Sequence, residues 1–183
     1  MPFRPVVLVH GGAWAIPESL WARSRAGVAA AAAAGHEALL HGKGTALDAV
    51  EAAVRVLEDD SAFDAGTGSV LNEDAQVEMD AVIMDGRTLR AGSVAAVQNV
   101  RNPVSLARLV MEKTDHVLLV GAGANKFAAK QGIVEVLPEE LVTAEAREQF
   151  EAIQQYQPGV DWLFRQQQQA HDTVGAVAMD AGA

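Results

Sequence analysis

The sequence has no cysteine and little positive charge, and both shortages exclude classes of function. Without cysteine, the chain forms no disulfide, offers no thiolate to a metal and has no cysteine nucleophile. It holds 14 Lys and Arg against 24 Asp and Glu, which gives a formal net charge of −10. Because nucleic acids and anionic membranes are bound mainly through Lys and Arg, we expect neither as a partner.

The start of the chain lacks the long apolar core of a signal peptide. A single Arg precedes an apolar run of only residues 6–9, which is too short for a signal-peptide core or a membrane-spanning helix. The 183 residues are 50% hydrophobic, which is enough for one packed core. We therefore expect one mature globular body, placed in the cytoplasm.

The hydrophobic pattern predicts a mixed α/β (α+β) order of elements. Strands are expected at residues 6–9, 117–120 and 173–179, and a meander within residues 69–97 turns at Asp85-Gly86. Helices are expected at residues 20–40, 46–57, 103–113 and 125–131, with Thr45 and Asn102 as N-caps and Gly132 as a stop signal. Residues 139–172 are rich in Glu and Gln and predict a flexible linker with some helix near residues 143–155.

Thr173 stands where this polar linker meets a strand, in the peptide His171-Asp172-Thr173-Val174-Gly175. A threonine at a new N-terminus carries its own base, an α-amine with a pKa of roughly 7.7 to 8.0. Cleavage before Thr173, assisted by Asp172, would create such a residue. The other interpretation is that Thr173 is an ordinary β-branched strand residue.

Four short stretches, distributed from residue 7 to residue 180, carry a resemblance to a known family. They are Val7-Leu8-Val9-His10-Gly11-Gly12, residues 57–72, residues 102–113 and residues 171–180. In this order they resemble the plant-type asparaginase and isoaspartyl peptidase family of N-terminal-nucleophile hydrolases. The resemblance implies a four-layer αββα sandwich, autocatalytic cleavage before Thr173, a homodimer of processed protomers, and hydrolysis of asparagine and β-aspartyl (isoaspartyl) peptides.

The resemblance also assigns site residues. Thr173 matches the nucleophile, and His10, Gly11 and Gly12 match the loop beside it. Residues 57–67 match a structural sodium loop, in which backbone carbonyls are expected to hold the ion; no cofactor is implied for catalysis. The carried-over positions are Leu57, Glu58, Asp60, Phe63, Ala65 and Thr67, and oxygen ligands suit such a hard cation.

Two positions depart from the family pattern. Relatives usually have asparagine where this chain has Asp64, a position that helps to orient the threonine. Many members of the asparaginase branch have glycine before the threonine, whereas this chain has Asp172, as in glycosylasparaginases. A glycosylasparaginase-like amidase is therefore the alternative within the same class of enzymes.

Ten residues follow Thr173 in this sequence. By the resemblance, residues 1–172 correspond to an α-subunit part with its linker, and residues 173–183 begin the β-subunit part. The family's further active-site residues would lie beyond Ala183, so we expect an incomplete sandwich that is inactive alone. A non-catalytic binding or scaffold module is the rival from another class of function.

Three other motifs predict nothing further. Gly121-Ala122-Gly123 has Lys126 in place of the last small residue of a dinucleotide fingerprint. His10-Gly11-Gly12 is similar to the oxyanion loop of α/β-hydrolases, but the chain has no G-x-S-x-G. The five histidines show no paired spacing that is typical of zinc.

Overall fold

The computed structural model describes residues 4–13, 16, 18–40, 44–154 and 173–182. The strands are β1 (Val6–His10), β2 (Met79–Met84), β3 (Ala91–Val97), β4 (Leu118–Val120) and β5 (Gly175–Met179). The helices are α1 (Trp21–Leu40), preceded by a short 3-10 turn η1 (Glu18–Leu20), then α2 (Ala46–Asp59), α3 (Pro103–Lys113), α4 (Gly121–Lys130), α5 (Pro138–Leu141) and α6 (Ala144–Gln154). The mixed α+β class predicted from the sequence is confirmed.

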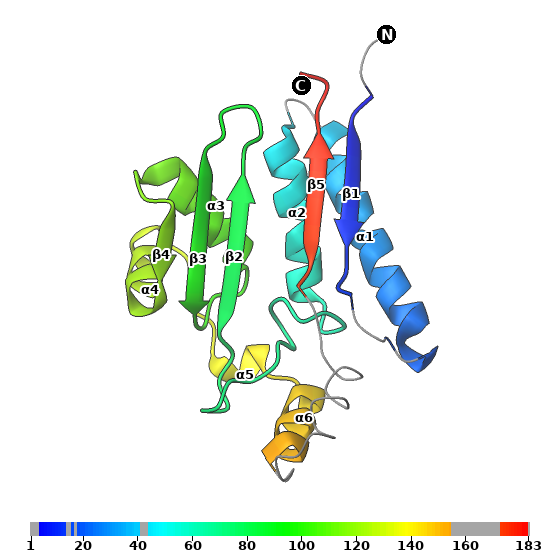
Figure 1. Cartoon of the computed structure of the whole chain (residues 1–183), viewed down its shortest axis with the longest axis vertical. Coiled ribbons are helices and arrows are strands. Elements are labelled where there is room, and N and C mark those ends of the chain that lie inside the picture. The colour runs from blue at the N-terminus through cyan, green and yellow to red at the C-terminus, as the bar shows by residue number, and fades with distance from the viewer. Residues whose placement is uncertain (1–3, 14–15, 17, 41–43, 155–172, 183) are drawn as a thin grey trace.

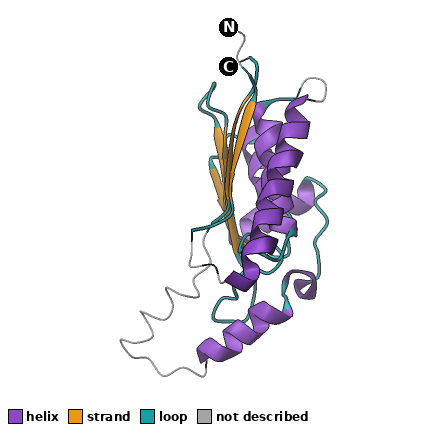
Figure 2. Cartoon of the chain, turned by 90° about the vertical axis from the view of Figure 1, so that its right-hand side faces the viewer, coloured by secondary structure: helices purple, strands orange, loops and turns teal. Residues whose placement is uncertain are grey.

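The strands form one layer, and helices cover one of its faces (Figures 1 and 2). β1 pairs with β5 in antiparallel fashion, while β3 pairs with β2 antiparallel and with β4 parallel. α1 and α2 pack together and against the β1–β5 pair, and α3 and α4 pack against β3. The described residues thus supply one helix layer and one sheet layer. None of the described helices is long and apolar enough to cross a membrane.

Two clusters of buried side chains hold the layers together. The larger one lies between β2, β3, α3 and α4, with Val94, Val97, Leu106 and Val110 at its centre. The smaller one is built on Ala31, Leu57 and Phe63, with five partly buried residues packed against it: Val9, Val28, Val56, Ala62 and Val174. The smaller cluster joins α1, α2, β1 and the residues that precede β5.

The face of the sheet opposite the helices is exposed and largely apolar. Its strand residues include Leu8 at 66% exposed, Val177 at 63% and Val82 at 70%. Side chains alternate across a strand, so a sheet covered on one face is usually polar on the other. An apolar outer face is what the expected four-layer sandwich would cover with its second sheet.

The ends of the helices test the predicted caps. The predicted cap of α2 is confirmed: Thr45 Oγ1 accepts a hydrogen bond from Asp48 N, and Asp48 accepts one from Thr45 N at 2.9 Å. Asn102 is the N-cap residue of α3 and Pro103 its first residue, as predicted, but the Asn102 side chain makes no cap hydrogen bond and instead donates to Asp59 Oδ1. A buried carboxyl, Glu58, takes its place, because Val104 N donates to Glu58 Oε1 at 2.9 Å.

Other predicted boundaries differ by a few residues. α4 begins at Gly121 rather than at residue 125, because β4 runs directly into it, and it ends before Gly132, which has a φ of +80°. β5 begins at Gly175 rather than at Thr173. Within the predicted linker, α6 confirms the helix expected near residues 143–155, and residues 155–172 lie outside the described part.

Candidate active site

The pairing of β1 with β5 places the predicted nucleophile beside the predicted loop. His10, the last residue of β1, is the partner of Gly175, the first residue of β5. Thr173 precedes Gly175 by two residues and is exposed, whereas its neighbour Val174 packs against the smaller cluster. Thr173 therefore stands at the end of the sheet where β1 gives way to Gly11 and Gly12. Asp172, the proposed helper in cleavage, lies outside the described residues.

The loop after β1 is folded tightly around its histidine. Gly12 N donates a hydrogen bond to His10 Nδ1 at 3.2 Å, and Gly12 has a φ of +102°, which favours glycine. At Gly11, a Cβ atom would lie 2.6 Å from Val28 Cγ1 and 2.8 Å from Phe63 Cε1. Ordinary contacts between carbon atoms are roughly 3.5 to 4.0 Å, so Gly11 is required because the loop presses on buried side chains.

Phe63 joins this loop to the predicted sodium loop. Its ring is 3% exposed and lies against both Gly11 and Gly27, where an added Cβ would come within 2.5 Å of Phe63 Cε2. Val174 packs in the same cluster. One aromatic ring therefore sets the spacing between α1, the loop that contains Gly11 and the residue that follows Thr173.

The segment of residues 57–67 is a compact turn held by its own backbone. Thr67 N donates to the carbonyl of Glu58 at 2.8 Å, and Phe63 N donates to that of Asp60 at 3.1 Å. From α1, Arg23 donates to Ser61 Oγ at 2.6 Å and lies 3.7 Å from Asp60 Oδ1. No sequence signal pointed to Arg23, because its partners lie far along the chain.

Two buried oxygen atoms in this segment match the chemistry of a cation site. Among the described residues, no hydrogen-bond partner reaches Glu58 Oε2 or Thr67 Oγ1. No group of three or more His, Asp or Glu side chains in the described part of the chain is placed to hold a metal ion, so an ion there would depend on carbonyl oxygens. The carbonyls of Glu58 and Asp60 each accept one hydrogen bond and keep a second lone pair for a ligand. The residues fit the expected sodium ion.

Glu58 itself was predicted only through its carbonyl, but its carboxyl has a separate role. The residue is 2% exposed, and burial raises the pKa of Glu58 to about 8, a shift that hydrogen bonds from Val104 and Asn102 partly oppose. Its Oε1 atom accepts from Val104 N and so caps α3. The carboxyl thus fastens the start of the turn to the neighbouring helix.

Asp64 closes the other end of this turn. Its Oδ1 atom accepts a hydrogen bond from Val70 N at 3.0 Å, and the residue is half-buried. Val70 also lines a hollow in the surface, together with Leu71, Asn72, Glu78, Asp80 and Ala96. Asp64 therefore braces a turn that borders an open, acidic surface.

Comparisons with known proteins identify the family. A family model described as asparaginase matches residues 3–183. The chain belongs to the asparaginase family. It is 51% identical to the isoaspartyl peptidase/L-asparaginase of Xenopus laevis and 48% identical to that of Homo sapiens, in each case over 96% or more of this chain and 56% of the relative.

A second group of relatives in the asparaginase family comes from archaea. The plant-type L-asparaginase of Pyrococcus abyssi is 47% identical over 95% of this chain and 59% of its own length. The chain therefore spans a little over half the length of the curated relatives that it matches.

Proposed function

We propose that this chain provides the nucleophile of a threonine-dependent amidohydrolase that acts on L-asparagine and on β-aspartyl (isoaspartyl) peptides. The observation that carries the proposal is the antiparallel pairing of β1 with β5, which sets Thr173 beside the loop of His10, Gly11 and Gly12. The names of the relatives, isoaspartyl peptidase/L-asparaginase and plant-type L-asparaginase, support the choice of substrates.

Maturation begins with the peptide bond before Thr173. Asp172 takes the proton of the Thr173 hydroxyl, and the oxygen attacks the carbonyl carbon of Asp172. The bond between that carbon and the Thr173 nitrogen breaks, the nitrogen takes up the hydroxyl proton from Asp172 to become the α-amine, and an ester replaces the amide. Water then hydrolyses the ester and leaves Thr173 with a free α-amine.

The mature threonine then serves as both nucleophile and base. Its α-amine takes the hydroxyl proton while the oxygen attacks the side-chain amide carbon of the substrate. The amide carbon–nitrogen bond breaks, ammonia or the released amine takes up the proton, and an aspartyl ester forms on Thr173. Water attacks this ester, which releases aspartate and restores the hydroxyl.

The turn of residues 57–67 contributes by holding side chains in place rather than by reacting itself. We assign the sodium ion to the carbonyls of Leu57, Glu58, Asp60, Phe63, Ala65 and Thr67, with the two unpartnered oxygens of Glu58 and Thr67 as the supporting observation. The ion would supply a fixed positive charge that holds the turn rigid. Phe63 and Asp64 would then keep a constant position relative to Thr173.

A paired arrangement of two processed protomers completes the proposal. In a longer protein, the exposed apolar face that contains Leu8, Val82 and Val177 would be covered by the second sheet of the sandwich. The rival function is a non-catalytic binding module, in which this exposed apolar face would contact a partner. An absence of cleavage would favour it.

The mass of the chain tests the proposed function. Cleavage before Thr173 would release a fragment of residues 173–183 from this chain. The decisive measurement uses the extended chain, by which we mean this chain continued past Ala183 to the length of its relatives. Intact mass spectrometry should show a new N-terminal Thr173, and Thr173→Ala should abolish both cleavage and asparagine hydrolysis. A folded extended chain that stays intact would favour the binding module.

A further inference from the structure

Asp180 links the end of the nucleophile strand to the start of α2. Its Oδ2 atom accepts a hydrogen bond from Ala46 N at 3.0 Å, and its Oδ1 atom accepts one from Gly182 N at 2.9 Å. Ala46 is the first residue of α2, so its N–H group has no acceptor within the helix. A carboxylate at this position also lies at the positive end of the helix dipole.

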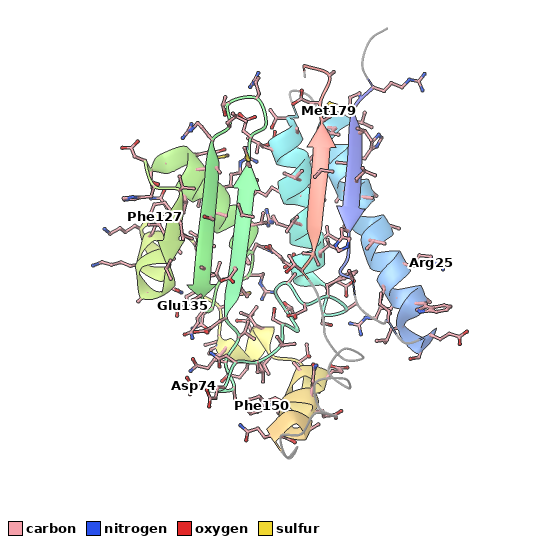
Figure 3. All side chains as sticks on the ribbon, viewed as in Figure 1. Arg25, Asp74, Phe127, Glu135, Phe150 and Met179 are labelled. Atoms are coloured by element: carbon pink, nitrogen blue, oxygen red, sulfur yellow. The ribbon has the colours of Figure 1, made fainter. Side chains whose placement is uncertain are left out.

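This hydrogen bond connects β5 and α2 at the end of each element that lies away from the candidate active site. β5 runs from the Thr173 end of the sheet to Met179, labelled in Figure 3, where α2 begins. α2 then runs back along β5 and ends at Asp59, just before the turn that contains Asp64 (Figure 1). Seven strand steps from residue 173 to residue 180 cover about 23 Å, and the helix of 14 residues covers about 21 Å. The two lengths are similar, and at the far end Val174 packs in the same cluster as Leu57 and Phe63.

We propose that Asp180 is a positioning residue: by anchoring β5 to the start of α2, it fixes where Thr173 lies along the sheet relative to the turn of residues 57–67. This inference rests on the proposed function, because it concerns the placement of the nucleophile. Cleavage before Thr173 frees one end of β5, so the position of the strand along its length then depends on its hydrogen bonds with β1, its packing against α2 and the anchor at Asp180.

The chain contains a matched control for this role. Asp85 also follows a strand and also accepts from the backbone two residues ahead, since Arg87 N donates to Asp85 Oδ1 at 3.0 Å. Its other oxygen accepts from Thr88 Oγ1, within the same turn. Asp180 differs in that its second oxygen reaches a helix far along the chain. Asparagine has one acceptor oxygen, so Asp180→Asn loses one of two bonds from backbone N–H groups, whereas in Asp85→Asn the Thr88 hydroxyl can accept from the new amide. Only Asp180→Asn can release α2.

Two measurements test the proposal. In this chain, amide hydrogen exchange at Ala46 and in β5 should become about tenfold faster in Asp180→Asn and stay unchanged in Asp85→Asn. In the extended chain, Asp180→Asn should lower the rate of cleavage and kcat about five- to tenfold, with KM within twofold of the wild type. Asp180→Glu keeps two acceptor oxygens and should restore part of the rate.

The outcomes separate this proposal from the function on which it rests. Unchanged exchange at Ala46 and β5 in Asp180→Asn would overturn the anchor, and so would wild-type cleavage and kcat despite faster exchange. An extended wild-type chain that folds but never cleaves overturns the proposed function, and the positioning role falls with it. Wild-type cleavage beside an unaffected Asp180→Asn chain overturns the positioning role alone.

Discussion

The close approach of the β1 loop to Phe63 predicts a specific cost for the change Gly11→Ala. The new Cβ would lie 2.6 Å from Val28 Cγ1 and 2.8 Å from Phe63 Cε1, about 1 Å closer than ordinary carbon contacts. Val28 is β-branched and stiff at χ1, and the Phe63 ring is buried among Ala31 and Leu57. Neither side chain can turn away cheaply, so the loop or the ring must shift.

Overpacking of this kind costs about 1 to 3 kcal/mol, which corresponds to a fall in Tm of roughly 2 to 12 °C in a protein of this size. Thermal unfolding of this chain, followed by circular dichroism, measures the change. Gly86→Ala is the matched control, because nothing lies within 4 Å of a Cβ at Gly86, and its effect should stay within about 0.5 kcal/mol.

A double variant locates the cause of the loss. Val28→Ala removes the nearer of the two clashing atoms, so Gly11→Ala combined with Val28→Ala should be more stable than the sum of the two single changes predicts. In the extended chain, Gly11→Ala should also slow cleavage before Thr173. If Gly11→Ala unfolds at the same temperature as Gly86→Ala, the contact between this loop and Phe63 is not the reason for the glycine.

Changes at three further residues probe the caps and the turn. Burial alone would raise the pKa of Asp48, but hydrogen bonds from Thr45 and Arg108 together with the charge of Arg108 outweigh it and lower the pKa below its ordinary value. The contribution of the carboxylate to stability is therefore complete above that ordinary value and lost as the pH falls through the lowered pKa. Asp48→Asn should cost about 1 kcal/mol at pH 7, and urea titrations of both proteins should converge under acid conditions. Glu58→Leu leaves Val104 N buried without its acceptor and should cost about 1 to 3 kcal/mol, whereas Glu58→Gln keeps an acceptor and should cost less in the same titration. Asp64→Asn keeps the acceptor for Val70 N and removes a negative charge at the position that the resemblance assigns to orienting Thr173, so it should raise the rate of cleavage or hydrolysis in the extended chain. A fall in both rates would show that the site is adapted to the carboxylate.

Local signals in the sequence were sufficient for most helices and strands. The box of Thr45 and Asp48 starts α2 as predicted, Asp85-Gly86 lies in the turn between β2 and β3, and the run after Thr173 is a strand. Each of these features depends on residues a few positions apart, which is the range over which propensity and capping act. The residues proposed for the active site came from the resemblance to a family, and their catalytic roles stay predictions.

The sequence by itself determined the elements, the excess of negative charge and the family to which the chain belongs. Only the tertiary structure decided which distant groups satisfy one another: the Glu58 carboxyl rather than the Asn102 side chain accepts from the first turn of α3, Asp180 accepts from the start of α2, and Phe63 fills the space that Gly11 leaves. A buried donor must find some acceptor, and a packed core must fill its space. Neither requirement names the partner, because the partner is whichever group the folded chain places within reach.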